Sequence, residues 1–300
     1  MKIGFIGLGA MGKPIAANLV KGGLDVTVHN RSQGKVQDLV ALGATAGTSP
    51  ANVTQGADVV MTCLQGAETV REVVCGPNGV LSAARPGLIV VDHSTIGPEP
   101  ARAIAAECAA KGVIYLDAPV SGAGPVAWSG NLTIMVGGDA AAYQTVLPAL
   151  QKAGKHIFHT GGVGSGNITK LINNLMLNTN LAATMEALVL GAKLGVDLDA
   201  LWGAVRTASG ASTQWEKVTP NLLARRFTPP TGAIANFTHG EANIKALAIA
   251  AGSPTPMFDA ACTLWQAALA MGLGPEDPTA AIKVLEAQAG VQVRGKDAPA

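Results

Sequence analysis

The sequence has almost no excess of charge, few aromatic side chains and few cysteines. Its 300 residues carry a formal net charge of +1 at pH 7, and 14% of them are charged. A chain this close to neutrality has no electrostatic attraction to nucleic acid or to an acidic membrane surface. We therefore expect a small-molecule partner, with no nucleic acid and no membrane involved.

The cysteines are too few and too scattered for a metal or disulfide framework. Cys63, Cys75, Cys108 and Cys262 contain no CxxC pair, which is typical of a reducing cytoplasm. The apolar run after Lys2 is too rich in glycine for a signal peptide. With 48% hydrophobic residues, a chain of this length is expected to be globular and to form about two domains.

A glycine-rich loop follows the first predicted strand, at residues 2–6. It reads Gly7-Leu8-Gly9-Ala10-Met11-Gly12 and leads into a predicted helix. In this GxGxxG pattern the first glycine makes a tight turn, the second lets a pyrophosphate approach the backbone, and the third packs helix on strand. The helix dipole then points at the phosphates. The strand, the loop and the helix together predict a dinucleotide site.

The end of the second predicted strand indicates which dinucleotide is bound. NAD-selective sites usually place an acid there for the ribose 2′-hydroxyl, whereas this chain reads Asn30-Arg31-Ser32. An arginine fork with a neighbouring amide and hydroxyl suits a 2′-phosphate, so NADP(H) is the predicted cofactor. The alternative is an arginine solvated in a turn.

Strand and helix patterns alternate as far as residue 162. This alternation predicts an α/β domain with a doubly wound, mostly parallel sheet of the Rossmann type over residues 1–162. Ligands bind such sheets at the carboxyl ends of the strands, where Cys63-Leu64, Ser94-Thr95 and Ser121–Gly124 fall. Residues 163–300 read as helices separated by Gly and Pro, which predicts an all-α second domain for substrate binding and dimerisation. Two of these helices are predicted to begin at Pro220 and at Gly240.

A long helix is predicted over residues 166–194, joining the domains. Its apolar positions form a stripe that something must cover: Ile168, Leu171, Ile172, Leu175 and Met176. A second face carries Lys170, Asn173, Asn174 and Asn178. These polar residues, with Asn180 and Glu186, argue against a membrane span. Lys170 either extends to solvent or faces a carboxylate or a ligand.

Other polar groups carry weaker signals. His156 and His159 form an HxxH without a third ligand, so no metal is expected. Asp92 and Asp117 lie at predicted strand ends, where an aspartate usually fixes a loop, and neither is assigned a catalytic role.

Four segments together resemble the β-hydroxyacid dehydrogenase family. They are GLGAMG at 7–12, DHST at 92–95, DAPVSG at 117–122 and GSGNITKLINN at 164–174. The family includes 3-hydroxyisobutyrate dehydrogenases, tartronate semialdehyde reductases and glyoxylate/succinic semialdehyde reductases. The resemblance extends to about residue 251 in the same order and spacing.

The resemblance implies roles for individual residues. Lys170 matches the catalytic lysine, and Asn174 the last Asn of KxxNN, which binds the substrate. The substrate set also includes Ser121, Gly122 and Ala123, with Phe237 either lining the pocket or packing in the core. The cofactor set is Gly7, Leu8, Gly9, Ala10, Met11, Gly12, Asn30, Arg31, Ser32, Cys63, Leu64, Thr95 and Lys245.

Two departures separate the chain from the family pattern. Ala123 stands where a third glycine is usual, and Ala246 stands where the family has Asp after Lys245. Glu241 lies one turn before Lys245 and is a candidate to supply the missing charge. We expect a shifted substrate preference, not loss of activity.

The predicted function is reversible hydride transfer between NADP(H) and a small β-hydroxy acid or aldehyde acid, with Lys170 as general acid and base. An imine reductase is one alternative, although such enzymes commonly lack the lysine. A non-catalytic NADPH-binding protein is the other. The chain is expected to be cytoplasmic and to form a homodimer or homotetramer, because apolar, alanine-rich helices favour pairing.

Overall fold

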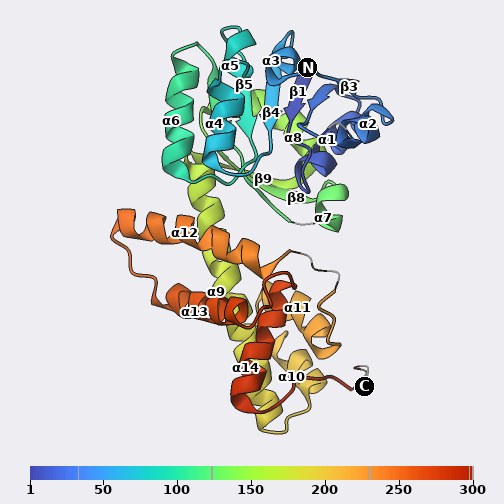
Figure 1. Ribbon diagram of the computed structural model, residues 1–300, viewed down its shortest axis with the longest axis vertical. Coiled ribbons are helices and arrows are strands. Elements are labelled where there is room, and N and C mark those ends of the chain that lie inside the picture. The colour runs from blue at the N-terminus through green and yellow to red at the C-terminus, as the bar shows by residue number, and fades with distance from the viewer. Residues whose placement is uncertain (33, 123, 229, 231, 297, 299–300) are drawn as a thin grey trace. The chain divides into compact units, whose positions relative to one another are not determined.

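The chain divides into two compact units, Met1–Leu171 and Ile172–Ala300, which we call the Rossmann unit and the helical unit. The computed structural model describes all residues except 33, 123, 229, 231, 297 and 299–300, and the backbone alone for 236 and 239. Figure 1 labels most of the elements.

The Rossmann unit contains one twisted sheet with helices on both faces. Its strands are β1 (Lys2–Ile6), β2 (Asp25–His29), β3 (Thr45–Ala46), β4 (Val59–Thr62), β5 (Ile89–Asp92), β6 (Ile114–Asp117), β7 (Val120–Ser121), β8 (Leu132–Gly137) and β9 (Gly154–Gly161). Its helices are α1 (Gly12–Lys21), α2 (Gly34–Val40), α3 (Pro50–Thr54), α4 (Ala67–Cys75), α5 (Val80–Ala83), α6 (Pro98–Ala109), α7 (Pro125–Trp128) and α8 (Ala140–Ala153).

The strand order is β3-β2-β1-β4-β5-β6-β8-β7, with β9 also paired to β8. From β3 to β6 all pairs are parallel, and β8 runs antiparallel to β6. This confirms the predicted α/β fold with a mostly parallel sheet. The order reverses beside β1, and in such sheets the ligand crevice lies at that point.

Alternating side chains of the strands serve two hydrophobic cores. Val59 and Met61 of β4 join the core that includes α1 and α8, whereas Val60 joins the core that includes α4 and α6. Figure 1 shows α4 and α6 beside each other, and α1 and α2 on the other side of the unit. Strands buried on both faces read as continuous apolar runs, which is why their positions could be predicted.

The helical unit contains most of α9 (Ser165–Lys193), followed by α10 (Leu198–Val205), α11 (Thr213–Leu223), α12 (Ile234–Ala251), α13 (Pro256–Ala270), the short 3-10 helix η1 (Pro278–Ala281) and α14 (Ile282–Ala289). Its core surrounds Trp265, which is fully buried. Buried Glu286 pairs with Arg225 and accepts a hydrogen bond from the Val293 amide (2.7 Å), which fastens the C-terminal segment to α14.

Two helix starts differ from the prediction. The segment predicted to begin at Pro220 begins at Thr213, where the Ser212 hydroxyl caps the helix by accepting from the Trp215 amide (3.0 Å). The segment predicted to begin at Gly240 begins at Ile234. Pro220 and Gly240 lie inside the helices, since packing onto the core outweighs the local preference of either residue for a break.

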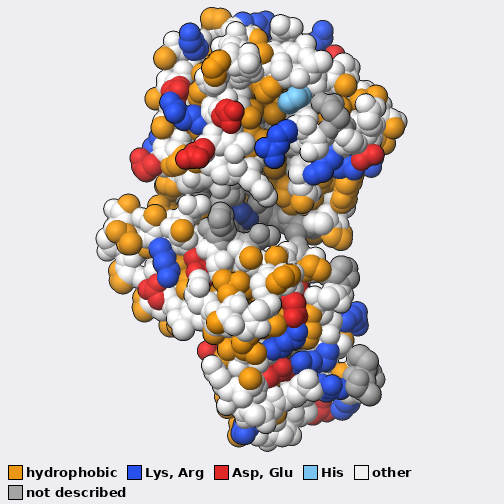
Figure 2. Space-filling view, in the orientation of Figure 1, with side chains coloured by type: hydrophobic (Ala, Val, Ile, Leu, Met, Phe, Trp, Pro, Cys, Tyr) orange, Lys and Arg blue, Asp and Glu red, His pale blue; other side chains and the backbone are white. Residues whose placement is uncertain are grey.

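α9 confirms the predicted central helix, but only part of its apolar stripe is buried. Leu171 is buried, whereas Ile172 and Met176 are 54% and 52% exposed. By length and composition alone α9 could cross a membrane. That test is weak for a single helix, because core helices pass it too, and the polar face of α9 argues against a span. Figure 2 shows basic and acidic side chains interspersed over the visible face, with hydrophobic ones between them.

Candidate active site

The glycine loop between β1 and α1 fits a dinucleotide pyrophosphate. A Cβ at Gly12 would lie 1.9 Å from the Gly7 carbonyl oxygen, so helix and turn approach too closely for any side chain. A Cβ at Gly9 would meet no atom within 4 Å, so open space lies over the loop there. No side chain caps the start of α1, so no side chain competes with an anion at that end of the helix.

The loop after β2 contains Asn30, which connects the loop to neighbouring backbone, and Arg31, whose charge points to no described partner. The Asn30 side chain accepts from the Leu8 amide (2.9 Å) and donates to the Ser32 carbonyl (3.0 Å), so it holds the glycine loop against β2. Arg31 and Ser32 are exposed. Within the described part of the chain, the Arg31 guanidinium has no hydrogen bond or ion pair. Of the predicted trio, Arg31 and Ser32 remain free to contact a 2′-phosphate.

Asp92 holds together the loops that follow β4 and β5. Its Oδ1 accepts from the hydroxyls of Thr62 (2.7 Å) and Ser94 (2.6 Å), and its Oδ2 accepts from Tyr115 (2.9 Å). The Ser94 hydroxyl in turn accepts from the Leu64 amide (2.9 Å). This network positions the predicted cofactor walls at Leu64 and Thr95. Asp92 fixes loops, as predicted.

Cys63 and His93 lie beside these walls in uncharged form. Burial, reinforced by the charge of Asp92, raises the pKa of the Cys63 thiol to about 12. Burial also lowers the pKa of His93, whose ring stacks on Phe5 and whose Nδ1 lies 2.8 Å from the Ala118 carbonyl oxygen. Both residues therefore pack against the site without titrating near neutral pH.

Asp117 fastens the first turn of α9 to the end of β6. Its carboxylate accepts from the amides of Gly164 and Asn167, both at 2.7 Å, and from the Asn167 side chain at 3.2 Å. Burial raises the Asp117 pKa, which these bonds counteract. A Cβ at Gly166 would lie 2.4 Å from the Met135 carbonyl oxygen, so only glycine allows this close approach.

Asn167 extends the connection to the loop after β5. Its Oδ1 accepts from the Ile96 and Gly97 amides at 2.9 and 3.0 Å. The side chain is fully buried, and it joins α9 to the segment that contains Thr95. Sequence reasoning missed this residue. The only sequence signal was an asparagine one turn before Lys170. It was not sufficient, because the hydrogen-bond partners of Asn167 lie about 50 and 70 positions away along the chain.

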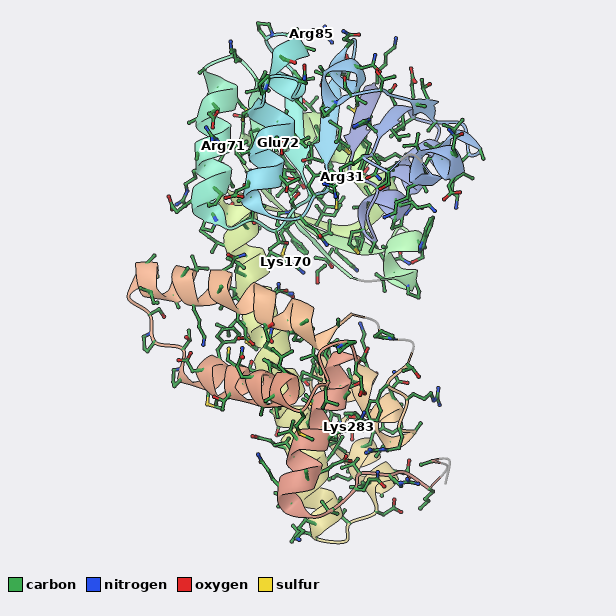
Figure 3. The ribbon with its side chains drawn as sticks, viewed as in Figure 1. Arg31, Arg71, Glu72, Arg85, Lys170 and Lys283 are labelled. Atoms are coloured by element: carbon green, nitrogen blue, oxygen red, sulfur yellow. The ribbon has the colours of Figure 1, made fainter. Side chains whose placement is uncertain are left out.

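Lys170 follows Asn167 by three residues and lies on the same side of α9. Figure 3 labels it on the first turns of the helix. Burial lowers the pKa of its amine from 10.5 to about 8. Of the two partners expected, no carboxylate among the described residues forms an ion pair with it. An amine of this kind can donate or accept a proton near neutral pH.

The remaining predicted residues of the Rossmann unit lie on the loop after β6. Ser121 ends β7, opposite Thr133 of β8, and is half-buried. Gly122 adopts φ of +118° and is exposed. Ala123 lies outside the described residues.

The Rossmann unit also contains a cavity of about 410 Å³ between α4 and α6, where Arg71 pairs with Glu107. None of the predicted site residues lines this cavity.

In the helical unit, Asn174 and Phe237 line one cavity of about 200 Å³. Phe237 also packs edge-on against Trp265, with ring centroids 5.4 Å apart, so it both lines this cavity and packs against the core of the unit. Lys245 pairs with Asp259 of α13 at 3.7 Å. Glu241 is buried, and its Oε1 has no hydrogen-bond partner among the described residues. Burial raises the pKa of Glu241 and the charge of Lys245 opposes that rise, so Lys245 has two acidic neighbours, Glu241 and Asp259. Ala246 is exposed.

Comparison with known proteins identifies the family. The NAD-binding domain of 6-phosphogluconate dehydrogenase matches residues 2–161, and the NAD-binding domain of NADP-dependent 3-hydroxyisobutyrate dehydrogenase matches 164–285. The chain belongs to the β-hydroxyacid dehydrogenase family. Members of this family are oxidoreductases that bind NAD(P), which confirms the class of enzyme and cofactor expected.

Three relatives of this β-hydroxyacid dehydrogenase illustrate the range of the family. The 2-(hydroxymethyl)glutarate dehydrogenase of Eubacterium barkeri is 40% identical, over 98% of both chains. The NAD-dependent L-serine dehydrogenase of Pseudomonas aeruginosa is 37% identical, over 92% of this chain and 95% of its own. The solved 3-hydroxyisobutyrate dehydrogenase of Mycobacterium tuberculosis, studied with L-serine, superimposes with a TM-score of 0.85 at 30% identity, covering 95% and 98% of the two chains.

Proposed function

We propose that this enzyme uses NADP(H) and reversibly oxidises the primary alcohol of a 3-hydroxy acid to an aldehyde. The compounds in the names of the three relatives share one skeleton, which is a carboxylate, a neighbouring carbon and a CH2OH group on that carbon. They differ in the group on the middle carbon, called here the C2 arm. The proposal is an acid of this skeleton, with the arm left open at this point.

Lys170 carries the proposal. Its amine has a pKa of about 8 and lies on a helix whose first turn is fastened to the loops after β5 and β6. In the oxidative direction neutral Lys170 accepts the alcohol proton, and the C–H bond breaks with its electron pair. When bound, the nicotinamide supplies or accepts that hydride. In reduction the ammonium of Lys170 returns the proton to the developing alkoxide.

The neighbouring groups of the Rossmann unit bind and orient. Ser121 and the backbone at Gly122 offer donors for a substrate carboxylate, and Thr95 borders the cofactor. The glycine loop has room for a pyrophosphate above Gly9, and Arg31 with Ser32 offers donors to a 2′-phosphate. One relative is NAD-dependent by name, so support for NADP(H) comes from Arg31 and the lack of an acid in that loop.

Replacing the lysine tests the proposal. Lys170→Ala should bind NADPH normally but lose about 10²–10⁴-fold in kcat, the usual contribution of general acid catalysis. Lys170→Arg should also fail, because a guanidinium stays charged at working pH. The measurements are kcat with 3-hydroxyisobutyrate and NADP+, and the NADPH dissociation constant by fluorescence titration.

Lys111→Ala, at an exposed lysine, is the control. If Lys170→Ala retains kcat, the lysine has no part in the mechanism. If Lys170→Arg retains it, the residue supplies charge alone. Turnover of cyclic imines in place of hydroxy acids would replace this proposal with an imine reductase.

The pH dependence provides a second test. The ammonium form is present below pH 8 and is lost as the pH rises through the pKa of about 8. The kcat for aldehyde reduction should therefore be level below pH 8 and fall by about tenfold per unit above it. The kcat for alcohol oxidation needs the neutral amine, so it should rise to pH 8 and then level off. Profiles without a break near pH 8 in either direction would contradict the role.

A further inference from the structure

The cavity between α4 and α6 has a cysteine in its wall. The cavity measures about 410 Å³ and lies wholly within the Rossmann unit. Figure 3 labels two residues of its lining, Arg71 and Glu72, both on α4. Cys75, the last residue of α4, also lines the cavity and is half-buried. A small molecule that enters the cavity can therefore reach the Cys75 side chain.

A second cysteine lies against the first. Cys108, near the end of α6, is fully buried in the hydrophobic core on which Cys75 packs. The helices α4 and α6 contact each other, and the thiols of Cys75 and Cys108 interact through a hydrogen bond. The spacing of the cysteines in the sequence gave no sign of this pair. Two cysteine side chains in contact are the starting arrangement for a disulfide.

The two thiols of the pair differ in acidity. The hydrogen bond with Cys108 lowers the pKa of the Cys75 thiol, and the charge of Arg71 acts in the same direction, against burial and the charge of Glu107. The same hydrogen bond, together with burial, raises the pKa of Cys108. Cys75 is therefore the residue that forms a thiolate, and Cys108 remains a thiol that donates to it. The thiolate is the form that reacts with oxidants.

The other two cysteines lie in different surroundings. Burial raises the pKa of Cys63 to about 12 and that of Cys262 to about 11. Thiols with such high pKa values are almost entirely protonated at neutral pH, so they react slowly. The fraction of thiolate changes about tenfold for each pKa unit. Oxidation should therefore be selective for Cys75.

The charges around the cavity indicate which oxidant can enter. Three carboxylates line it, those of Glu68, Glu72 and Glu107, and the only guanidinium in its lining belongs to Arg71, which pairs with Glu107 at 2.8 Å. An oxidant that carries carboxylates, such as oxidised glutathione, would meet charges of its own sign in this wall. An uncharged hydroperoxide meets no such repulsion. The wall therefore favours a small, neutral oxidant.

We propose that Cys75 and Cys108 form a modification site for hydroperoxides, in which Cys75 is oxidised and Cys108 converts the product to a disulfide between α4 and α6. First the Cys75 thiolate attacks one peroxide oxygen. An S–O bond forms, the O–O bond breaks, and hydroxide leaves, so that the peroxide is reduced and Cys75 becomes a sulfenic acid.

The second step uses the thiol of Cys108. Its sulfur attacks the sulfenic sulfur of Cys75, an S–S bond forms, the S–O bond breaks, and the oxygen leaves as water with the Cys108 proton. Attack by an external thiol reduces the disulfide again. The site goes beyond the proposed hydride transfer, because neither step involves Lys170 or the cofactor.

Peptide mapping of the oxidised enzyme provides the test. The full chain is reduced, freed of reductant and treated with hydrogen peroxide, and in parallel with oxidised glutathione at the same concentration. With peroxide the wild-type chain should lose the mass of two hydrogens, and the peptides that contain Cys75 and Cys108 should be found linked. Dithiothreitol should separate them. Cys75 should react at least about tenfold faster than Cys63 or Cys262.

Variants assign the two steps. Cys108→Ser keeps a donor beside Cys75 but cannot form the disulfide, so the sulfenic acid should persist and be trapped on Cys75 by dimedone. Cys75→Ser should abolish both the sulfenic acid and the disulfide. Cys262→Ser, at a buried cysteine of the helical unit, is the matched control and should form the disulfide at the wild-type rate. Circular dichroism of the reduced variants checks that each one folds.

Three results would overturn the proposal. A wild-type chain without linked peptides after peroxide treatment has no such site, whether or not the variants fold. Equal trapping of dimedone on Cys63 or Cys262 in Cys108→Ser would remove the selectivity for Cys75. Faster disulfide formation with oxidised glutathione than with peroxide would show that the acidic wall does not select a neutral oxidant. All three readouts are masses, so they do not depend on the dehydrogenase reaction.

Discussion

The two units of the molecule differ in how many of their buried polar atoms have a hydrogen-bond partner. In the Rossmann unit Asp92, Asp117 and Asn167 are fully buried, and each carboxylate or amide oxygen in these networks has partners. Among the described residues, one buried side-chain atom of that unit, Nε2 of His93, lacks a partner. The other five such atoms among the described residues all belong to the helical unit, on Asn178, Trp202, Thr219, Glu241 and Trp265.

This difference separates a unit whose buried polar side chains are held in place by hydrogen bonds from a unit that contains several unpaired buried atoms. A satisfied network holds its members in one arrangement, as loops that receive a cofactor and a catalytic lysine require. An unsatisfied buried atom is costly unless something else supplies its partner. We therefore expect substitutions in the Rossmann unit to damage the enzyme, and substitutions in the helical unit to change or even improve it.

The largest effect should follow from breaking the network at Asp117. Asp117→Asn keeps the shape but replaces one acceptor by a donor that faces an amide, so the bonds to Gly164 or Asn167 are lost. We expect unfolding free energy to fall by about 3 kcal/mol, with a lower kcat because the first turn of α9 loosens. Urea denaturation measures the first. Asp25→Asn, at an exposed position, is the control. Equal stability of the two variants would show that the hydrogen bonds of Asp117 to the first turn of α9 do not stabilise the fold.

A smaller effect is expected from Arg31, which belongs to the Rossmann unit but has no hydrogen bond or ion pair with any described residue. Arg31→Ala should weaken NADPH binding by about tenfold to a hundredfold, the value of one charge-assisted contact, and leave NADH binding and stability unchanged. Isothermal titration with both cofactors tests this. A wild-type enzyme with equal affinity for NADPH and NADH would show that the 2′-phosphate is not recognised.

The smallest effect should come from replacing the buried Glu241 of the helical unit by an uncharged side chain. Burial raises the pKa of this carboxyl, so the folded protein holds its proton more tightly than the unfolded chain. That stabilisation is complete below the ordinary value of 4.5 and is lost as the pH rises through the raised pKa. Glu241→Gln should therefore raise Tm by about 2–4 °C at pH 8 and have little effect at pH 4. A gain of equal size at both pH values would exclude ionisation as the cause.

Local patterns made much of the fold predictable. The glycine loop, the alternation of strands and helices, and the long helix with Lys170 all follow from residues adjacent in sequence. The brace at Asn167 could not be predicted, because Asp117 and Ile96 lie far away along the chain. For the same reason spacing along one helix indicated Glu241 as an acidic neighbour of Lys245, whereas Asp259, which approaches Lys245 from the next helix, could not be predicted.

The hydrogen bonds between Asp117 and Asn167 also have a consequence for how these two positions change during evolution. Each side chain completes the hydrogen bonding of the other, and Asn167 additionally completes that of Ile96 and Gly97. A mutation at either position alone removes partners that no neighbour replaces, so its carriers would be selected against before a compensating change arose. The two positions should therefore vary together among descendants of a common ancestor, while the exposed Arg31 is free to drift when the supply of one cofactor changes.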